Sequence, residues 1–281
     1  MKKIIIVFAA LLSMGSYAQN QRFVYEYKFV KDSTARDETK HELMFLDTAP
    51  KGSKFYSHEK YISDSLREDR IKTGERNFSG INFDFVPFVV EKVYPDYKTV
   101  FYGNLDMDLY KVSDDRVQHW KILPDKAKIG DIEVQKATLD FSGRKWIAWF
   151  APDIPIQDGP YKFHGLPGLI IKIEDKTQSH SFTLKETKKL SKNNEWQSEG
   201  EKKNSRQFIN VAPEKYKKQF LESRNDPAKG LKEMASGSQK IMLVNESGKP
   251  LDISEVIRER EKNAKAENAK NNNILELDLL Q

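Results

Sequence analysis

The sequence predicts a mainly β protein, built as one large curved antiparallel sheet or an open barrel with a few helices and a helical C-terminus. Residues 22–30 alternate with period two and place Phe23, Tyr25, Tyr27 and Phe29 on one face, which is typical of a half-buried strand. From residue 83 to residue 123, short apolar runs recur about every ten residues between turn signals. Because no long helix separates these runs, parallel βαβ units are not expected.

Other segments fit the same plan. Further strands are expected at residues 41–46, 54–61, 132–141, 145–150 and 179–187. Residues 63–80 are polar and predict a surface helix or a loop. Pro213 suits the first turn of a helix that carries Tyr216 and Phe220 on one face. A last helix is expected from residue 252, but it has no apolar stripe, so residues 252–281 are interpreted as a charged helix and tail.

The N-terminus has the pattern of a secretory signal peptide. Lys2 and Lys3 precede an apolar run that is far shorter than the roughly 20 residues of a membrane span, and small residues stand before Gln19. Cleavage is expected near Ala18, which leaves residues 19–251 as one β-rich domain before the C-terminal helix. The mature chain should therefore be periplasmic or otherwise secreted, without a transmembrane segment.

The amino-acid composition limits the classes of partner and cofactor that are expected. The chain has no cysteine, so neither disulfides nor lipid attachment through cysteine contributes to it. Its 47 basic residues are nearly balanced by 42 acidic ones, so nucleic-acid binding is not expected. Signatures of catalytic serine or cysteine, of a zinc protease, of a P-loop and of a dinucleotide site are missing, and no cofactor is predicted.

Residues 140–175 hold the densest set of turn and aromatic residues in the chain. Pro167 presets φ for a turn, and Gly168 can take the positive φ that the third position of a type II turn requires. A strand should follow, with Leu169, Ile171 and Ile173 on its more apolar face.

This stretch resembles the GLPGLI family, secreted proteins of Bacteroidetes named after that motif. The residues that carry the pattern are Gly159, Pro160, Gly165, Leu166, Pro167, Gly168, Leu169 and Ile170. The segment Lys136–Thr138 also fits, although Val134 stands near the position where many members have a cysteine. The resemblance implies a Gram-negative envelope but no particular activity.

The aromatic residues of this stretch allow two interpretations. They can form a core cluster, or one face of the sheet can carry an apolar groove for a ligand. Strand alternation assigns Trp146 to the core and makes Trp149 the better candidate for a ligand-facing position. Tyr161, Phe163 and His164 are the other candidate binding residues, although a lone histidine is more often structural.

Candidate catalytic groups are few. Asp106 and Asp108 lie two apart and should share one face of a strand, where they could bind a cation or simply face solvent. No catalytic residue and no metal ligand is assigned. The sequence thus favours a non-catalytic envelope protein that binds an apolar ligand or an outer-membrane protein. The alternative is a periplasmic hydrolase acting on envelope or imported glycans, since such an enzyme needs only two carboxylates.

Overall fold

A computed structural model describes residues 20–75, 79–82, 85–106, 108–191, 196–202, 207–237 and 249–281. The predicted signal peptide lies outside these residues. The strands are β1 (Gln21–Val30), β2 (Thr39–Ala49), β3 (Gly52–Ser57), β4 (Val89–Val93), β5 (Lys98–Leu105), β6 (Asp108–Asp114), β7 (Lys121–Ile129), β8 (Ile132–Phe141), β9 (Arg144–Ala151), β10 (Leu169–Asp175), β11 (His180–Lys189) and β12 (Ile209–Val211). The helices are α2 (His58–Lys72), α3 (Pro213–Asn225), α4 (Lys229–Ser236) and α5 (Ile253–Lys270), with short 3-10 turns η2 (Glu199–Glu201) and η3 (Leu277–Leu280).

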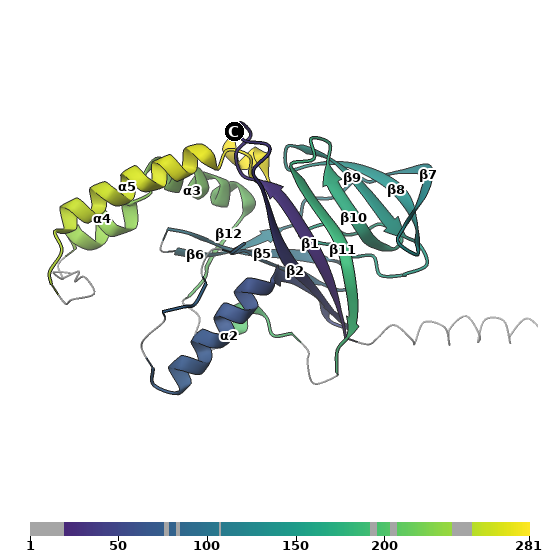
Figure 1. Cartoon of the computed structure of the whole chain (residues 1–281), viewed down its shortest axis with the longest axis horizontal. Coiled ribbons are helices and arrows are strands. Elements are labelled where there is room, and N and C mark those ends of the chain that lie inside the picture. Colours follow the sequence, from purple (N-terminus) through teal and green to yellow (C-terminus); the bar gives the residue numbers. More distant parts are fainter. Residues whose placement is uncertain are drawn as a thin grey trace, which may run out of the picture.

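The strands form one sheet in the order β12-β6-β5-β4-β3-β2-β1-β11-β10-β9-β8-β7. Neighbouring strands are antiparallel except for the short β12, which runs parallel to β6 and which the sequence pattern did not reveal. The two outermost strands do not pair with each other, so the sheet is open. The predicted class, a mainly β fold with a large curved sheet and a helical C-terminal part, is confirmed (Figure 1).

The sheet curves around the loop that joins β9 to β10. Lys92 of β4 and Trp146 of β9 both contact this loop, although five strands lie between β4 and β9 in the sheet. Strand β1 lies midway between β4 and β9 in the sheet. Its Tyr25 donates a hydrogen bond at 2.7 Å to the carbonyl of Ile170, which stands in β10 just after the loop. One loop can reach strands so far apart only if the sheet bends around it, so the main core lies inside the curve.

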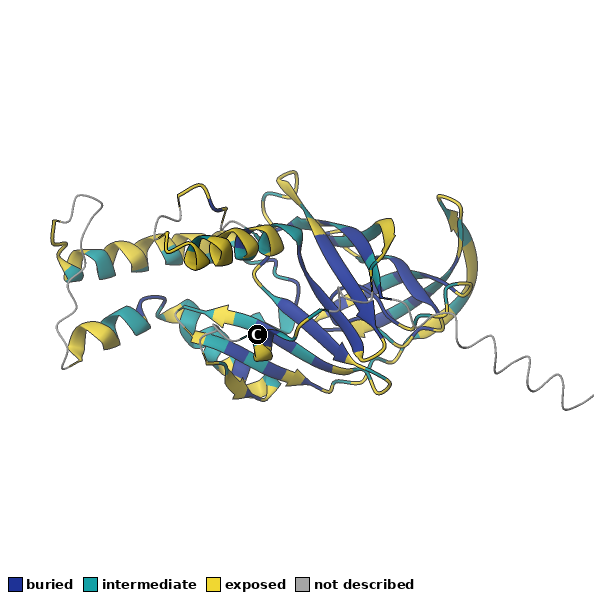
Figure 2. Cartoon of the chain, turned by 90° about the horizontal axis from the view of Figure 1, so that it is seen from below, coloured by how far each residue is buried: buried dark blue, intermediate teal, exposed yellow. Residues whose placement is uncertain are grey.

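Of the described α-helices, only α3 contributes a side chain, Tyr216, to this core. Ser57 caps α2, and its side chain accepts a hydrogen bond from the Lys60 N–H, so the helix begins where the sequence pattern suggested that a strand continued. In Figure 2 the buried residues concentrate in the central strands, whereas α4 and α5 are largely exposed. No described helix combines the length and apolar character needed to cross a membrane.

The end of the chain returns to the sheet. The buried Arg144 donates hydrogen bonds to the Ile274 and Leu275 carbonyls and to the Asn273 side chain. Asn273 also donates to the Lys31 carbonyl through its backbone N–H, at 3.0 Å. Residues 273–276 are therefore built into the fold, whereas the boundary assigned to a C-terminal helix and tail stays a prediction.

The burial of Trp146 and Trp149 shows which side of β9 faces the core. Trp146 is 1% exposed and donates to the Phe141 carbonyl, while Trp149 is half-buried beneath the Lys136 ammonium. Trp146→Ala should lower the free energy of unfolding by about 3–5 kcal/mol, the range for a buried aromatic side chain. Trp149→Ala should cost clearly less. Urea unfolding of both variants measures this, and equal losses would show that both rings are core.

Candidate functional site

The loop of residues 152–168 is held by a buried ion pair. The Lys92 Nζ lies 2.5 Å from the Asp158 Oδ1, and both side chains are fully inaccessible. The same ammonium donates to the carbonyls of Gly159, Tyr161 and Phe163 at 2.7, 3.0 and 3.2 Å. Asp158 accepts further hydrogen bonds from the Tyr94 hydroxyl and the Gly159 N–H. Loop and sheet are thus joined through one charged centre.

The turn at Pro167 and Gly168 has a different geometry from the one expected. The Gly168 N–H donates to the Leu166 carbonyl, two residues back, rather than closing a four-residue turn. Gly168 has a φ of 157°, and a Cβ at this position would lie 2.1 Å from the Ala151 carbonyl oxygen. Glycine is therefore required mainly because the backbone of Ala151 approaches so closely.

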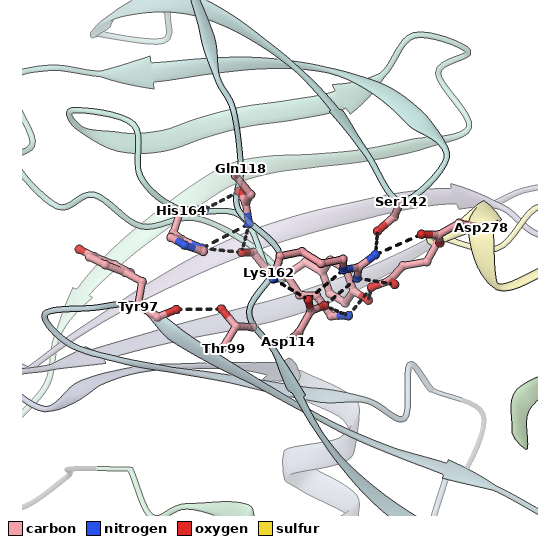
Figure 3. Close-up of polar contacts among 11 residues, drawn as sticks. Tyr97, Thr99, Asp114, Gln118, Ser142, Lys162, His164 and Asp278 are labelled. Carbon is pink, nitrogen blue, oxygen red and sulfur yellow. Dashed lines mark hydrogen bonds and ion pairs between the residues drawn. The ribbon is translucent and has the colours of Figure 1, made fainter. Parts of the chain in front are cut away.

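A charge cluster joins the loop to the C-terminus; it consists of Asp114, Arg116, Lys162, Glu276 and Asp278 (Figure 3). The Lys162 Nζ lies 2.8 Å from Asp114 and 2.5 Å from Glu276. Burial acts to raise the pKa of both carboxyls, but the neighbouring cations Arg116 and Lys162 hold each below its usual value. Both groups are therefore ionised acceptors, which suits a structural link better than acid catalysis.

A second buried link joins strands β1 and β11 to the C-terminal segment. The His180 Nε2 lies 2.8 Å from the Asn273 carbonyl oxygen, and its Nδ1 lies 2.7 Å from the Tyr27 hydroxyl. Since a carbonyl only accepts, Nε2 carries the proton and Nδ1 accepts from Tyr27. Burial, with the nearby Arg144, lowers the pKa of His180 to about 4. The imidazole is therefore neutral at pH 7.

A cavity of about 1030 Å³ lies between the sheet and the helices α3 and α5. An aromatic wall lines it, formed by Tyr27, Phe29, Phe88, Phe101, Tyr216 and Phe220. Within this wall the rings of Phe101 and Tyr216 meet edge to face, with centroids 5.5 Å apart. The cavity exists because α5 has no apolar stripe with which to pack against the sheet.

The opposite side of the cavity is polar. The face of α5 that lines it carries Arg260, Asn263, Ala264 and Asn268, and Asn271 follows the helix. These positions recur at helical spacing, so they share one side of α5. Arg260 also reaches Asp106, at 2.6 Å, and so connects α5 with the β5–β6 hairpin. An apolar wall therefore faces a polar helix surface across one cavity.

The four candidate binding residues do not form one site, although the rings of Tyr161 and Phe163 meet edge to face with centroids 6.2 Å apart. Tyr161 lines the cavity and hydrogen-bonds to Glu276. Phe163 is fully buried against Trp146, with ring centroids 4.8 Å apart. His164 stacks on Tyr97 and lies beside Gln118 (Figure 3). Trp149 and His164 are not among the cavity-lining residues, and a binding role for them stays a prediction.

The expected pairing of Asp106 with Asp108 on one strand face is wrong. Asp106 has a φ of 52° and lies in the turn after β5, whereas Asp108 begins β6. Asp106 accepts hydrogen bonds from Arg260 and from the Gly230 N–H. Within the described residues, no group of three or more histidine, aspartate or glutamate side chains is placed to hold a metal ion.

Sequence reasoning missed the cavity, although part of its signal was present. The alternation that grouped Tyr27 with Phe29 and the helical spacing of Tyr216 and Phe220 mark four of its wall residues. No local pattern indicated that the two segments face each other. Lys92, inside an apolar strand, and Asp158, 66 positions later, likewise carried no mark of pairing.

Comparison with solved structures shows a similarity in fold. Two structures of PNGF-II, in space groups C2 and P21, are similar to this chain with a TM-score of 0.50 each and identities of 18% and 17%. The similarity covers 74% of this chain but only 34% of PNGF-II. This chain thus spans about a third of PNGF-II, and the likeness concerns the fold alone.

Comparison with families gives one local match. Residues 141–172 match the family model described as "Protein of unknown function (Porph_ging)". The match covers β9, the loop and the start of β10, the stretch on which the resemblance to an uncharacterised family rests. No curated protein matches the sequence.

The buried ion pair yields a stability prediction. Lys92→Met or Asp158→Asn should each lower the free energy of unfolding by about 3–5 kcal/mol, because each leaves one buried charge or polar group without its partner. The double variant should lose less than the sum of the two. Urea unfolding measures all three, with Lys145→Met, which breaks the exposed pair with Asp140, as a control expected to change little. Additive losses would contradict the coupling.

His180 yields a pH prediction. In the unfolded chain histidine titrates near pH 6.5, so below that pH the unfolded state binds a proton that folded His180 takes up only near pH 4. Stability should therefore fall by about 3 kcal/mol through this group as the pH drops from 7 to 4. Urea unfolding across this range, compared with His180→Gln, measures the difference. Identical pH profiles would show that His180 titrates normally.

Proposed function

We propose that this chain is a non-catalytic binding protein of the cell envelope that holds an apolar ligand in the cavity beneath α5. The observation that supports this most is the aromatic wall facing a space of about 1030 Å³. Small-molecule sites usually occupy about 300–1,000 Å³ and combine apolar walls with a few polar groups. The signal-like N-terminus supports export, and the resemblance to secreted Bacteroidetes proteins supports the periplasm as its place.

The size of the cavity favours a small ligand over a segment of an outer-membrane protein, the other partner that the sequence suggests. The hydrolase alternative, acting on envelope or imported glycans, gains no support from the cavity carboxylates. Asp106 is paired with Arg260, and Glu276 with Lys162 and Arg116. A glycosidase needs one carboxyl held protonated near neutral pH, and the pKa of Glu276 is lowered instead.

A cavity-filling variant tests the proposal. Ala264 faces the cavity from α5, so Ala264→Trp should occupy the space while leaving the helix intact. Binding of N-phenyl-1-naphthylamine, a neutral apolar fluorophore, should weaken at least about tenfold, the equivalent of about 1.4 kcal/mol. Ala266→Trp is the matched control, because Ala266 is exposed on the same helix and does not line the cavity.

Three results are decisive here. Fluorophore binding by the wild type and by Ala266→Trp, with loss in Ala264→Trp, supports the cavity as the binding site. Equal binding by all three proteins places the fluorophore elsewhere and contradicts the proposal. Absence of binding to the wild type contradicts it as well. Circular dichroism of the variants confirms that each is folded before binding is compared.

A further inference from the structure

The carboxylates that line the cavity have partners within the protein, whereas two of the lining cations form no ion pair among the described residues. Each lining carboxylate already has partners within the protein: Glu42 accepts from the Val86 N–H, Asp106 pairs with Arg260, and Glu276 pairs with Lys162. Two lining cations, Lys31 and Arg224, form no ion pair with a carboxylate in the described part of the chain. The described part of the cavity wall therefore has an excess of positive charge that no carboxylate of the described residues neutralises.

Both of these residues contact the segment in which α5 ends. Arg224 at the end of α3 donates to the Asn268 carbonyl at 2.5 Å, and the Lys31 carbonyl accepts from the Asn273 N–H at 3.0 Å. Both residues are thus attached to the short segment 268–273, where α5 ends. Asn271 in this segment also lines the cavity, and its carboxamide has no hydrogen-bond partner among the described residues. Three cavity-lining residues whose side chains can donate to an anion, Lys31, Arg224 and Asn271, therefore belong to this segment or contact it.

Arg224 is suited to more than a structural contact. Its guanidinium lies 5.8 Å from the centroid of the Phe220 ring, a member of the aromatic wall. Burial lowers the pKa of Arg224, because no carboxylate offsets the loss of solvent. The hydrogen bond to Asn268 uses one of five N–H donors, which leaves a planar group able to bind a carboxylate or phosphate through two bonds.

We propose that the cavity selects an acidic amphiphile, a molecule with one apolar chain and a carboxylate or phosphate head, and that Arg224 and Lys31 bind the head. This inference rests on the proposed function, since the aromatic wall must hold the chain. The apolar part is then buried against the rings, while the head offsets a cation that is partly removed from water. A neutral amphiphile of the same length leaves that cation without an anionic partner.

Arg224 also has a purely structural interpretation, because a cation near the C-terminal carbonyls of α5 interacts favourably with the helix dipole. The two roles differ in what a substitution changes. Loss of a structural contact weakens the binding of every ligand alike and lowers the stability of the protein. Loss of a head-binding group weakens the binding of anionic ligands and leaves the binding of a neutral ligand unchanged. The ratio of two affinities therefore separates them.

The experiment measures displacement of N-phenyl-1-naphthylamine by dodecanoate, dodecyl phosphate and dodecan-1-ol, each below its micelle-forming concentration, from the full mature chain. The wild type should bind at least one anion about tenfold tighter than the alcohol, and added salt should narrow this ratio. Lys31→Gln with Arg224→Gln should remove the ratio and leave the alcohol affinity unchanged. Lys215→Gln is the matched control, because Lys215 is exposed on α3 and does not line the cavity.

The anion arms identify the source of the head group. Tighter binding of dodecanoate indicates a fatty acid, and tighter binding of dodecyl phosphate indicates a phospholipid-type ligand. Equal affinities of the wild type for alcohol and anions overturn the inference while the proposed apolar site stands. An equal loss of all three ligands in the double variant overturns it in favour of the structural role. Failure of the wild type to bind even the fluorophore overturns both proposals together.

Discussion

The buried contact between Lys92 and the β9–β10 loop is the interaction on which the rest of this structure depends. An ammonium group taken out of water is costly unless charges and hydrogen bonds replace its hydration. Asp158 and three loop carbonyls supply that replacement, so the loop must lie where β4 can reach it. Because the same loop starts and ends in strands far across the sheet, satisfying Lys92 also draws the two halves of the sheet together.

The curvature created in this way explains the other links. Once the loop lies inside the curve, Lys162 is positioned to meet Asp114 from β6 and Glu276 from the C-terminal segment. Arg144 and His180 then hold the neighbouring Asn273 from β9 and β11. The end of the chain is thus fastened by groups that come from opposite parts of the sheet. Each of these contacts is buried, so removing one partner leaves a charged or polar group without compensation.

The cavity follows from what the C-terminal helix lacks. A helix with an apolar stripe would pack closely against the aromatic wall, but α5 presents an arginine, asparagines and one alanine to it. Polar contacts link it to neighbouring segments, Arg260 near its middle with Asp106 and Asn268 near its end with Arg224. The result is a helix held at a distance from an apolar surface. Such an arrangement leaves room for a ligand that has both an apolar and a polar part.

Local patterns in the sequence were sufficient for much of the fold class. Alternation in β1 and the apolar run of β10 predict strands because side chains of a strand point to opposite faces, a rule that acts over a few residues. The same rule placed Trp146 in the core. It could not predict the parallel β12, which is only three residues long, or the start of α2 at His58, where a helix cap competes with an extended pattern.

What the sequence by itself determined is therefore the kind of most elements, strands or helices, the need for glycine at position 168, and the polar character of the last helix. Only the tertiary structure decided which of these elements meet. The pairing of Lys92 with Asp158, the return of Glu276 to Lys162, and the meeting of Tyr27 and Tyr216 in one cavity wall join segments far apart in the chain. No periodicity records such contacts, because they depend on how strongly a twelve-stranded sheet curves, a property of all its strands together.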